Sequence, residues 1–192
     1  MNYFRGSPYR NLNPIMFILG INIIVFFAVR LFPDLIGQLG LWGRPLFIQR
    51  PWGLITSMFT HYDLFHLFAN MFTLYFFGNF VLRIIGVNKF IMLYLLGGML
   101  GGVFFVLLSP YSLAIGASGA VFALGGALAI LVPNAKVLVF PIPAPMPLWI
   151  AVIGGFVILS FMSGVAWQAH LGGLLAGMAG GLIFKRSTPY YF

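Results

Sequence analysis

The sequence lacks cysteine and contains very little charge. None of its 192 residues is cysteine, and only 6% are charged. A chain without cysteine forms no disulfide, has no thiol nucleophile and offers no thiolate to a metal ion. A soluble domain of this length has about a quarter charged residues. The composition therefore excludes an ordinary soluble domain and any catalysis by cysteine.

Acidic residues are almost absent. Asp34 and Asp63 are the only carboxylates, whereas lysine and arginine together number 10, which gives a formal net charge of +8. The basic residues are scattered between apolar segments and form no patch. This distribution is typical of membrane-topology signals and not of a nucleic-acid-binding surface. We therefore expect no nucleic-acid partner.

Long apolar blocks make up most of the chain, in which 61% of the residues are hydrophobic. A helix needs about 20 apolar residues to cross a bilayer. We expect an all-α polytopic membrane protein, a bundle of six transmembrane helices that forms one domain over residues 1–192. Arg5 and Arg10 precede the first block, but no small-residue cleavage pattern follows, so we expect a retained span and not a signal peptide. The expected spans are residues 14–29, 64–81, 90–108, 118–132, 147–161 and 165–184.

Lysine and arginine lie unevenly on the two sides of these spans. With the N-terminus inside, the inner side holds most of them, and an excess of positive charge marks the cytoplasmic side. We therefore expect an integral membrane protein with a cytoplasmic N-terminus and a cytoplasmic C-terminus. The small size suggests a prokaryotic inner membrane. The inner residues are Arg5, Arg10, Arg83, Lys89, Lys136, Lys185 and Arg186, and the outer ones are Arg30, Arg44 and Arg50.

Two connections between the spans are long. The outer one, residues 30–63, contains Trp42 and Trp52. Tryptophan prefers the interface between membrane and water, so we expect this loop to lie there. The inner one, residues 134–147, is rich in proline. Proline opposes helix, so we expect extended chain in this connection.

Few strongly polar side chains lie within the apolar blocks: His66 and Asn70 in the second, Ser118 in the fourth and His170 in the sixth. These three spans enter from the outer face, and a rise of 1.5 Å per residue places His66 and Asn70 roughly 5 to 10 Å below it and His170 roughly 8 Å below it. The fourth block is about 15 residues long, too short for the hydrocarbon core, so with its inner end at the inner surface Ser118 also lies roughly 8 Å deep. His66 and Asn70 are four residues apart, hence on one helix face. Polar side chains inside a membrane are costly and mark functional sites by default. Their shared depth favours one catalytic site.

Helix packing and metal binding are the alternatives to a catalytic role for these residues. A lone intramembrane serine often bonds to its own helix or to a neighbour, so packing alone also accounts for Ser118. His61, His66 and His170 could bind zinc, but His61 precedes its span and no carboxylate lies near His170. Both carboxylates fall in or beside the outer loop, which disfavours a membrane-embedded Ser-His-Asp triad. We prefer a Ser-His dyad without metal or cofactor.

Small residues recur at every fourth position in the fourth and sixth spans. They are Gly119, Ala123 and Ala127 in the fourth span and Gly173, Gly177 and Gly181 in the sixth. Such stripes let two helix backbones approach closely, which would bring Ser118 near His170. We expect only the sixth span to present its glycines to the fourth helix. Gly97 and Gly98 of the third span should then tolerate larger side chains better.

Three short motifs together resemble those of the rhomboid family of intramembrane serine proteases. GASG at residues 116–119 resembles the G-x-S-G nucleophile motif of that family. AHLGG at residues 169–173 resembles its A-H-x-x-G motif, and HLFAN at residues 66–70 resembles its H-x-x-x-N motif. The motifs occur in the family order, and the resemblance covers nearly the whole chain.

The resemblance implies an endopeptidase that cleaves transmembrane helices of substrate proteins near the outer leaflet. Ser118 would attack the peptide bond, and His170 would be the general base and then the acid for the leaving amine. The oxyanion would bind to the backbone N–H of Ser118 together with His66 and Asn70. The implied partners are transmembrane substrate proteins and the lipid bilayer, and no cofactor is implied.

We assign packing roles to five further residues, three of them through this resemblance. Gly116 and Gly119 would allow a tight helix start and close approach of the substrate. Phe122 takes the place of a tyrosine that often stacks on the catalytic histidine of the family. Gly173 and Gly177 belong to the close-packing stripe of the last span.

The chain departs from the family pattern outside the dyad. A Trp-Arg pair of the first outer loop appears here as Trp52-Gly53, and Leu82 replaces an acidic residue near the inner end of the second span.

An alternative function is a catalytically inactive rhomboid-like protein that binds membrane clients. Such proteins lack the serine or the histidine, and this chain has both. A transporter is expected to show paired halves or coupling carboxylates, and we find neither.

Overall fold

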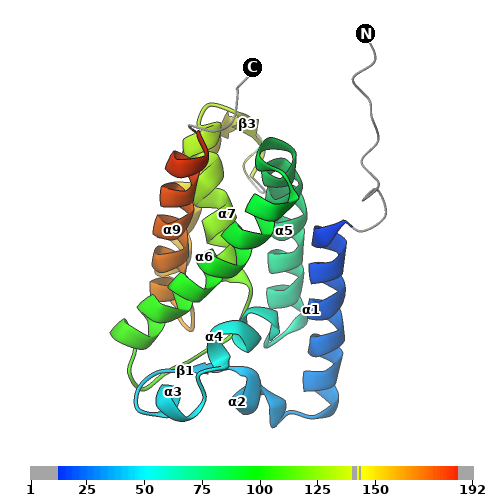
Figure 1. Ribbon diagram of the computed structural model, residues 1–192, viewed down its shortest axis with the longest axis vertical. Coiled ribbons are helices and arrows are strands. Elements are labelled where there is room, and N and C mark those ends of the chain that lie inside the picture. Colours follow the sequence, from blue (N-terminus) through cyan, green and yellow to red (C-terminus); the bar gives the residue numbers. More distant parts are fainter. Residues whose placement is uncertain (1–12, 140–141, 143, 186–192) are drawn as a thin grey trace.

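Six apolar helices form a bundle in the computed structural model, which describes residues 13–139, 142 and 144–185 (Figure 1). Each overlaps one of the expected spans, with boundaries that differ by at most four residues, so the predicted all-α membrane fold is confirmed. Their bounds are α1 Pro14–Leu31, α5 Leu64–Ile85, α6 Val87–Leu108, α7 Ser118–Leu131, α8 Leu148–Ser160 and α9 Trp167–Lys185. Gly86, with φ of 78°, makes the turn between α5 and α6, both of which are longer than the apolar blocks indicated.

The helices differ in their ability to cross a bilayer. By length and composition, α1, α5 and α6 are each long and apolar enough to do so, whereas α7 and α8 are apolar but shorter. Helix α9 is long enough but less apolar than these, and it falls in neither group. At 1.5 Å per residue, the 14 residues of α7 extend about 21 Å, compared with about 30 Å of hydrocarbon. At least one end of α7 therefore lies within the apolar layer.

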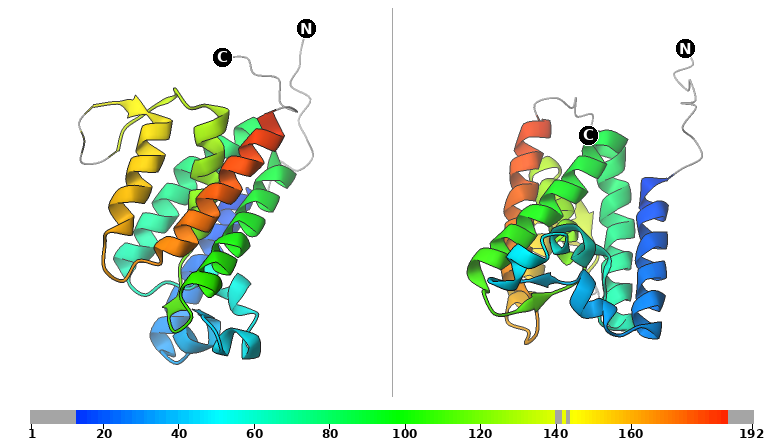
Figure 2. Two further views of the ribbon diagram at one scale, coloured as in Figure 1. Left: turned by 90° about the vertical axis from the view of Figure 1, so that its left-hand side faces the viewer. Right: turned by 60° about the horizontal axis from the view of Figure 1, so that its bottom comes forward.

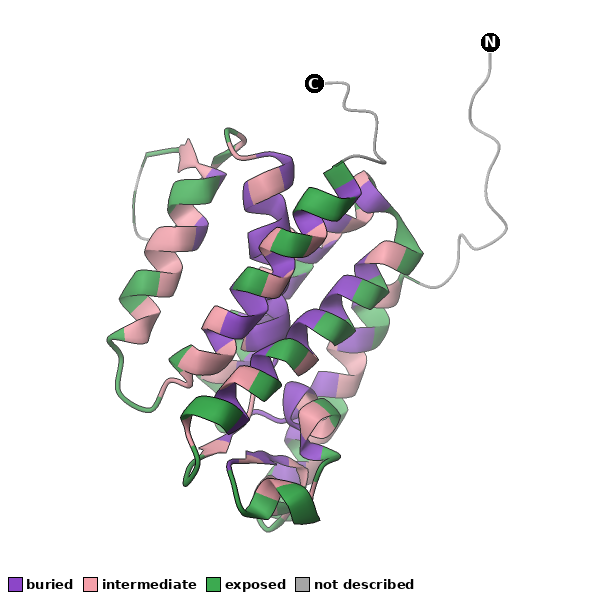
Figure 3. Cartoon of the chain, turned by 60° about the vertical axis from the view of Figure 1, so that its left-hand side comes forward, coloured by how far each residue is buried: buried purple, intermediate pink, exposed green. Residues whose placement is uncertain are grey.

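Helix α7 lies at the centre of the bundle, in contact with α5, α6, α8 and α9. Most of its residues are buried, which makes this helix largely purple in Figure 3. Many of them are glycine or alanine, whose small side chains let neighbouring helices approach from several directions. The central position explains why polar groups at the start of α7 are enclosed by other elements.

The glycine stripe of α9 faces α7, as the sequence predicts. A β-carbon at Gly173 would collide with the carbonyl oxygen of Gly119, and one at Gly177 would collide with that of Ala123. The two backbones therefore touch along this stripe. The contact places the first turn of α9 beside the first turn of α7.

The prediction that only the sixth span presents glycines to α7 is wrong. A β-carbon at Gly97 of α6 would meet the β-carbon of Ala123, and one at Gly98 would lie 3.1 Å from that of Ala120. Helix α7 carries small residues on more than one face, so α6 and α9 both pack closely against it. The four-residue spacing of small residues predicts the face of α7 that packs against α9, but it does not indicate the face that packs against α6.

Short elements connect α1 to α5 at the lower end of the bundle in Figure 1. They are α2 Leu35–Leu39, β1 Leu41–Trp42, α3 Leu46–Gln49, α4 Gly53–Thr56 and the 3-10 helix η1 Ser57–Phe59. Strand β1 pairs antiparallel with β2, Leu113–Ala114, shortly before α7 begins. The right-hand view of Figure 2 brings this end of the molecule forward. The predicted outer loop is thus a folded unit attached to the segment that leads to Ser118.

The opposite end of the bundle carries the connection between α7 and α8. Strand β3, Lys136–Val137, pairs antiparallel with β4, Met146–Pro147, so the two ends of the proline-rich connection are extended, as expected. Leu138 and Ile142 between them are exposed. Helix α1 begins and α9 ends at this same end of the bundle (Figure 1).

Candidate active site

Ser118 and His170 are hydrogen bonded to each other near the outer-loop end of the bundle. Ser118 is the first residue of α7, and His170 lies in the first turn of α9. The Oγ of Ser118 and the Nε2 of His170 are 2.8 Å apart. His170 is buried, with 5% of its surface exposed. The fold thus joins two polar side chains that are 52 positions apart in the sequence.

The other ring nitrogen of His170 is held by packing and not by a polar neighbour. Its Nδ1 is buried and has no hydrogen-bond partner in the described part of the chain. The ring of Phe122 lies against it, with centroids 4.6 Å apart and planes inclined by 32°. Phe122 also makes an edge contact with Phe156 of α8, at 6.0 Å. The described residues therefore form a dyad with an aromatic support.

A side-chain hydrogen bond fixes the start of α9. The Nε2 of Gln168 donates to the Oγ of Ser109 over 2.6 Å. Ser109 is the C-cap residue of α6, and Gln168 lies two positions before His170. The contact ties the turn that carries His170 to the end of a long membrane helix.

Gly116 shapes the segment that precedes Ser118. Its φ of 120° lies in a region that L side chains rarely adopt. A β-carbon at Gly116 would also lie 2.7 Å from the Nε2 of His66. The absence of a side chain therefore serves the backbone turn and lets the His66 ring approach. Gly119, in the first turn of α7, faces the carbonyl oxygen of Ala169 in the same tight region.

Helix α5 carries the two side chains expected to bind an oxyanion. Asp63 caps this helix by accepting a hydrogen bond of 2.7 Å from the N–H of His66, which fixes the first turn. The Nδ2 of Asn70 donates to the carbonyl oxygen of His66 over 2.9 Å, and an amide has a second N–H for another acceptor. Because Ser118 begins α7, its N–H has no partner within the helix.

His61 is a site residue that sequence reasoning missed. The sequence suggests it only as a zinc ligand, yet it is fully buried and its Nε2 accepts a hydrogen bond of 3.4 Å from the N–H of Ala117. Its ring also makes an edge contact with that of His66, at 5.0 Å. Burial, together with the nearby His66, lowers the pKa of His61 to about 3. No periodic pattern marks a loop residue as buried, so only the tertiary fold reveals its place.

The described residues contain no group of three histidine, cysteine or acidic side chains that could hold a metal ion. His61 and His66 approach each other edge to plane, with ring planes inclined by 66°. The Nε2 of His61 is engaged with the main chain, and that of His170 with Ser118.

Arg50 and Trp52 anchor the outer loop to α2. The Nη1 of Arg50 donates to the carbonyl oxygen of Gly37 over 2.8 Å, and the Nε1 of Trp52 donates to that of Gln38 over 2.9 Å. Arg50, two positions before Trp52, thus anchors the loop, although glycine follows the tryptophan. A β-carbon at Gly53 would lie 2.7 Å from a main-chain oxygen just before β1, so glycine is the residue that fits there.

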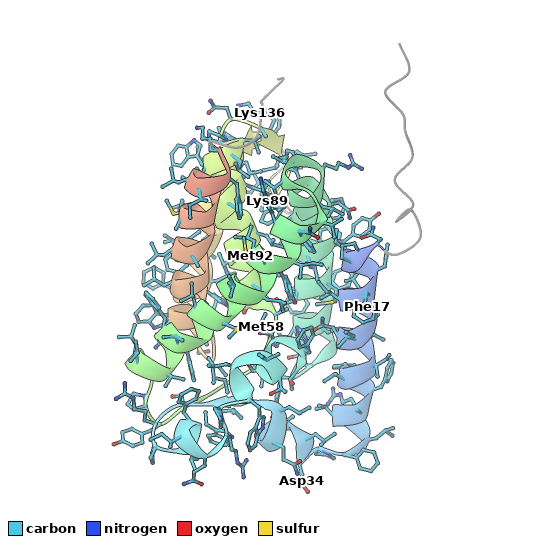
Figure 4. All side chains as sticks on the ribbon, in the orientation of Figure 1. Phe17, Asp34, Met58, Lys89, Met92 and Lys136 are labelled. Atoms are coloured by element: carbon cyan, nitrogen blue, oxygen red, sulfur yellow. The ribbon has the colours of Figure 1, made fainter. Side chains whose placement is uncertain are left out.

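A cavity of about 30 Å³ lies beside the dyad. Ser57, Met58, Gly119 and Ala169 are among the residues that line it, together with Ser118. Met58 belongs to η1 and lies where the outer loop meets the helices (Figure 4). The volume suits about one water molecule, and Ser57 and Ser118 are the lining residues with a hydroxyl group.

Comparison with known proteins identifies the family. The Rhomboid domain profile matches residues 49–187. Rhomboid protein 1, mitochondrial, of Saccharomyces cerevisiae is 29% identical over 220 aligned positions, which cover 97% of this chain and 56% of the yeast protein. RHOMBOID-like protein 12, mitochondrial, of Arabidopsis thaliana is 37% identical over 62% of this chain and 42% of its own length. Rhomboid protease GluP of Bacillus subtilis is 33% identical over 66% of this chain and 24% of its own length.

The match to the Rhomboid domain covers most of the sequence, and the chain therefore belongs to the rhomboid family. The chain spans about half or less of the length of the three relatives named above. The likeness thus concerns the part of each relative that aligns with this chain.

Proposed function

We propose that this rhomboid-family chain is an intramembrane serine endopeptidase that uses Ser118 and His170 as a catalytic dyad. The observation that carries the proposal is the 2.8 Å contact between the Ser118 Oγ and the His170 Nε2. The dyad lies at the start of a buried central helix, in a chain that is largely apolar. A buried Ser-His pair beside N–H donors is suited to acyl transfer.

The proposed reaction has two steps. In the first, His170 takes the proton of the Ser118 hydroxyl while the Oγ forms a bond to the carbonyl carbon of the substrate peptide. The tetrahedral oxyanion accepts hydrogen bonds from the Ser118 N–H, the His66 ring and the second N–H of Asn70. His170 then gives its proton to the leaving amine, the C–N bond breaks, and an acyl-enzyme remains.

In the second step, water replaces the amine. His170 takes a proton from the water, whose oxygen attacks the acyl carbon. Collapse of the second tetrahedral intermediate breaks the bond to the Ser118 Oγ, which regains a proton from His170. The cavity beside Ser118 has room for about one water molecule next to the dyad.

The substrates we propose are transmembrane proteins that are cut near the outer leaflet. The proposal treats the chain as one membrane domain with both termini on the cytoplasmic side. Lys136 lies at one end of the bundle and Asp34 at the other, which agrees with an inner side rich in positive charge (Figure 4). A prokaryotic inner membrane stays a prediction, since the relatives named above come from mitochondria and from a bacterium.

The test is incubation of the purified protein with a single-span membrane substrate, in parallel with a Ser118→Ala variant. We expect cleavage by the wild-type protein, none by the variant, and labelling of Ser118 by a fluorophosphonate probe. Cleavage that persists in the variant would show that another group is the nucleophile. A wild-type protein that neither cleaves nor reacts with the probe would instead be an inactive, client-binding member of the family.

A further inference from the structure

The outer loop runs along the segment that leads to Ser118 and is bonded to it at successive positions. The N–H of Gly43 donates to the carbonyl oxygen of Ser112 over 2.9 Å. Strand β1 then pairs with β2. Further along, the N–H of Gly116 donates to the carbonyl oxygen of Ser57 over 2.9 Å. In each of these hydrogen bonds, both the donor and the acceptor are main-chain groups.

The last bond of this series is different, because a side chain makes it. The N–H of Ala117 donates to the Nε2 of His61 over 3.4 Å. Ala117 is the residue immediately before Ser118, and it is fully buried, as is His61. A buried N–H without an acceptor is costly, so this main-chain group depends on the imidazole.

The protonation state of His61 suits a permanent acceptor. A ring nitrogen accepts a hydrogen bond only when it carries no proton. The pKa of His61 is lowered to about 3, chiefly because burial disfavours the charged ring. His61 therefore stays neutral at the pH at which a protease of this kind would work, with its proton on Nδ1.

We propose that His61 is a positioning residue, which holds the peptide plane before Ser118 by accepting the Ala117 hydrogen bond. This inference rests on the proposed protease function. Ala117 is also the N-cap residue of α7, so its orientation sets the direction in which the Ser118 side chain and N–H leave the helix. The ring of His61 also contacts that of His66, at 5.0 Å between centroids. One side chain therefore contacts both the main chain before Ser118 and the His66 ring, which are two parts of the proposed oxyanion site.

Two substitutions separate the hydrogen bond from mere volume. In His61→Gln, the side-chain amide reaches as far as the Nε2 of histidine and can present an oxygen to Ala117. In His61→Asn, the amide ends near the Nδ1 position and falls short of it. Tyr62→Gln changes an adjacent residue that is 65% exposed and provides the matched control.

Three quantities are measured on each variant in detergent: the rate of Ser118 labelling by a fluorophosphonate, hydrogen exchange of the Ala117 amide, and the temperature of unfolding. We expect His61→Asn to slow labelling by about 10- to 100-fold, since a small misplacement of a reacting group has effects of that size. It should also speed exchange at Ala117. His61→Gln should restore both values most of the way, and Tyr62→Gln should resemble wild type.

Equal labelling and equal exchange in the Gln and Asn variants would overturn the inference. The assay temperature can also be lowered well below the unfolding temperature of His61→Asn. If the labelling rate of the variant then equals that of the wild type, the inference is overturned in favour of a purely structural role, because the loss reflected unfolding alone. A wild-type protein that is not labelled at all would contradict the proposed protease function. Exchange at Ala117 would still decide in that case whether His61 holds the segment.

Discussion

Gly173 of α9 faces the carbonyl oxygen of Gly119 of α7 with no room for a β-carbon between them. Because Ser118 immediately precedes Gly119 and His170 lies one turn before Gly173, this backbone contact sets the distance between the two dyad residues. The glycine stripe is therefore part of the site as well as of the packing. Its effect can be measured by adding a single methyl group.

We expect Gly173→Ala to lower the stability of the protein by about 1–3 kcal/mol, as overpacking of a close contact does. Gly155→Ala in α8 is the control, since nothing lies within 4 Å of a β-carbon there. Alanine favours helix over glycine by about 1 kcal/mol, so the control should be neutral or stabilising. Thermal unfolding in detergent shows whether each substitution lowers or raises the stability of the protein. A stable Gly173→Ala protein would mean that α7 and α9 can separate at little cost.

The dyad predicts that Ser118 and His170 act as one unit. His170→Ala should reduce cleavage to background while the protein stays folded, because the ring is supported by Phe122 and not by a buried charge. The double variant with Ser118→Ala should be no less active than either single variant. The values of kcat/KM for the three proteins test this. Additive losses would imply that the two side chains contribute independently.

Replacement of His66 or Asn70 by alanine should slow cleavage without abolishing it. Loss of one oxyanion donor costs up to about 10²–10³ in kcat, and here a main-chain N–H and one side chain would remain. Thr73→Val is the control on the same helix, because Thr73 also bonds back to a carbonyl of its own helix, that of Ala69, over 2.8 Å. If the control lowers kcat as much as Asn70→Ala does, the effect comes from the helix and not from the oxyanion.

The six spans and the dyad could be predicted because each leaves a periodic or spaced signal. Apolar runs fix the helices, and the shared depth of Ser118 and His170 indicates that they meet. The His61 contact could not be predicted, since it joins a loop side chain to one backbone N–H. The approach of Gly97 and Gly98 to α7 could not be predicted either, because these residues, together with Gly101 and Gly102, place glycine on several faces of α6 at once.

The hydrogen bonds of Arg50 and Trp52 to α2 lead to a prediction about the outer loop that differs from the family pattern. Gly53→Arg would restore the residue expected after Trp52, yet it should destabilise the outer loop, because a β-carbon at position 53 would lie 2.7 Å from the carbonyl oxygen of Gly40. Gly37→Ala is the control, since its nearest neighbour would lie 4.0 Å away. The measurement is limited proteolysis of the loop together with thermal unfolding. Greater protection in Gly53→Arg would show that the loop accommodates a side chain at position 53 and gains an anchor there.

The last prediction concerns where a substrate is cut. The dyad lies at the outer-loop end of α7, and this helix is only about 21 Å long. In the proposed orientation we therefore expect the reacting carbonyl to reach a point within the outer part of the membrane. A stable helix keeps its carbonyl groups in its own hydrogen bonds, so the substrate must be locally unwound there. Glycine, proline and other weak helix formers near the outer end of the substrate span should therefore speed cleavage.

This can be tested with a series of model substrates in which leucines are inserted one by one between the outer boundary and the original cut site. We expect the cut, mapped by mass spectrometry, to stay at a fixed depth below the outer boundary and so to move along the sequence as leucines are added. A second series, with a glycine pair placed at that depth or at the inner end of the span, separates depth from sequence. Only the outer pair should raise the rate, because only there does unwound chain meet Ser118. Cuts that follow the inner glycine pair, or that fall in the cytoplasmic part of the substrate, would contradict both the depth of the dyad and the orientation of the bundle.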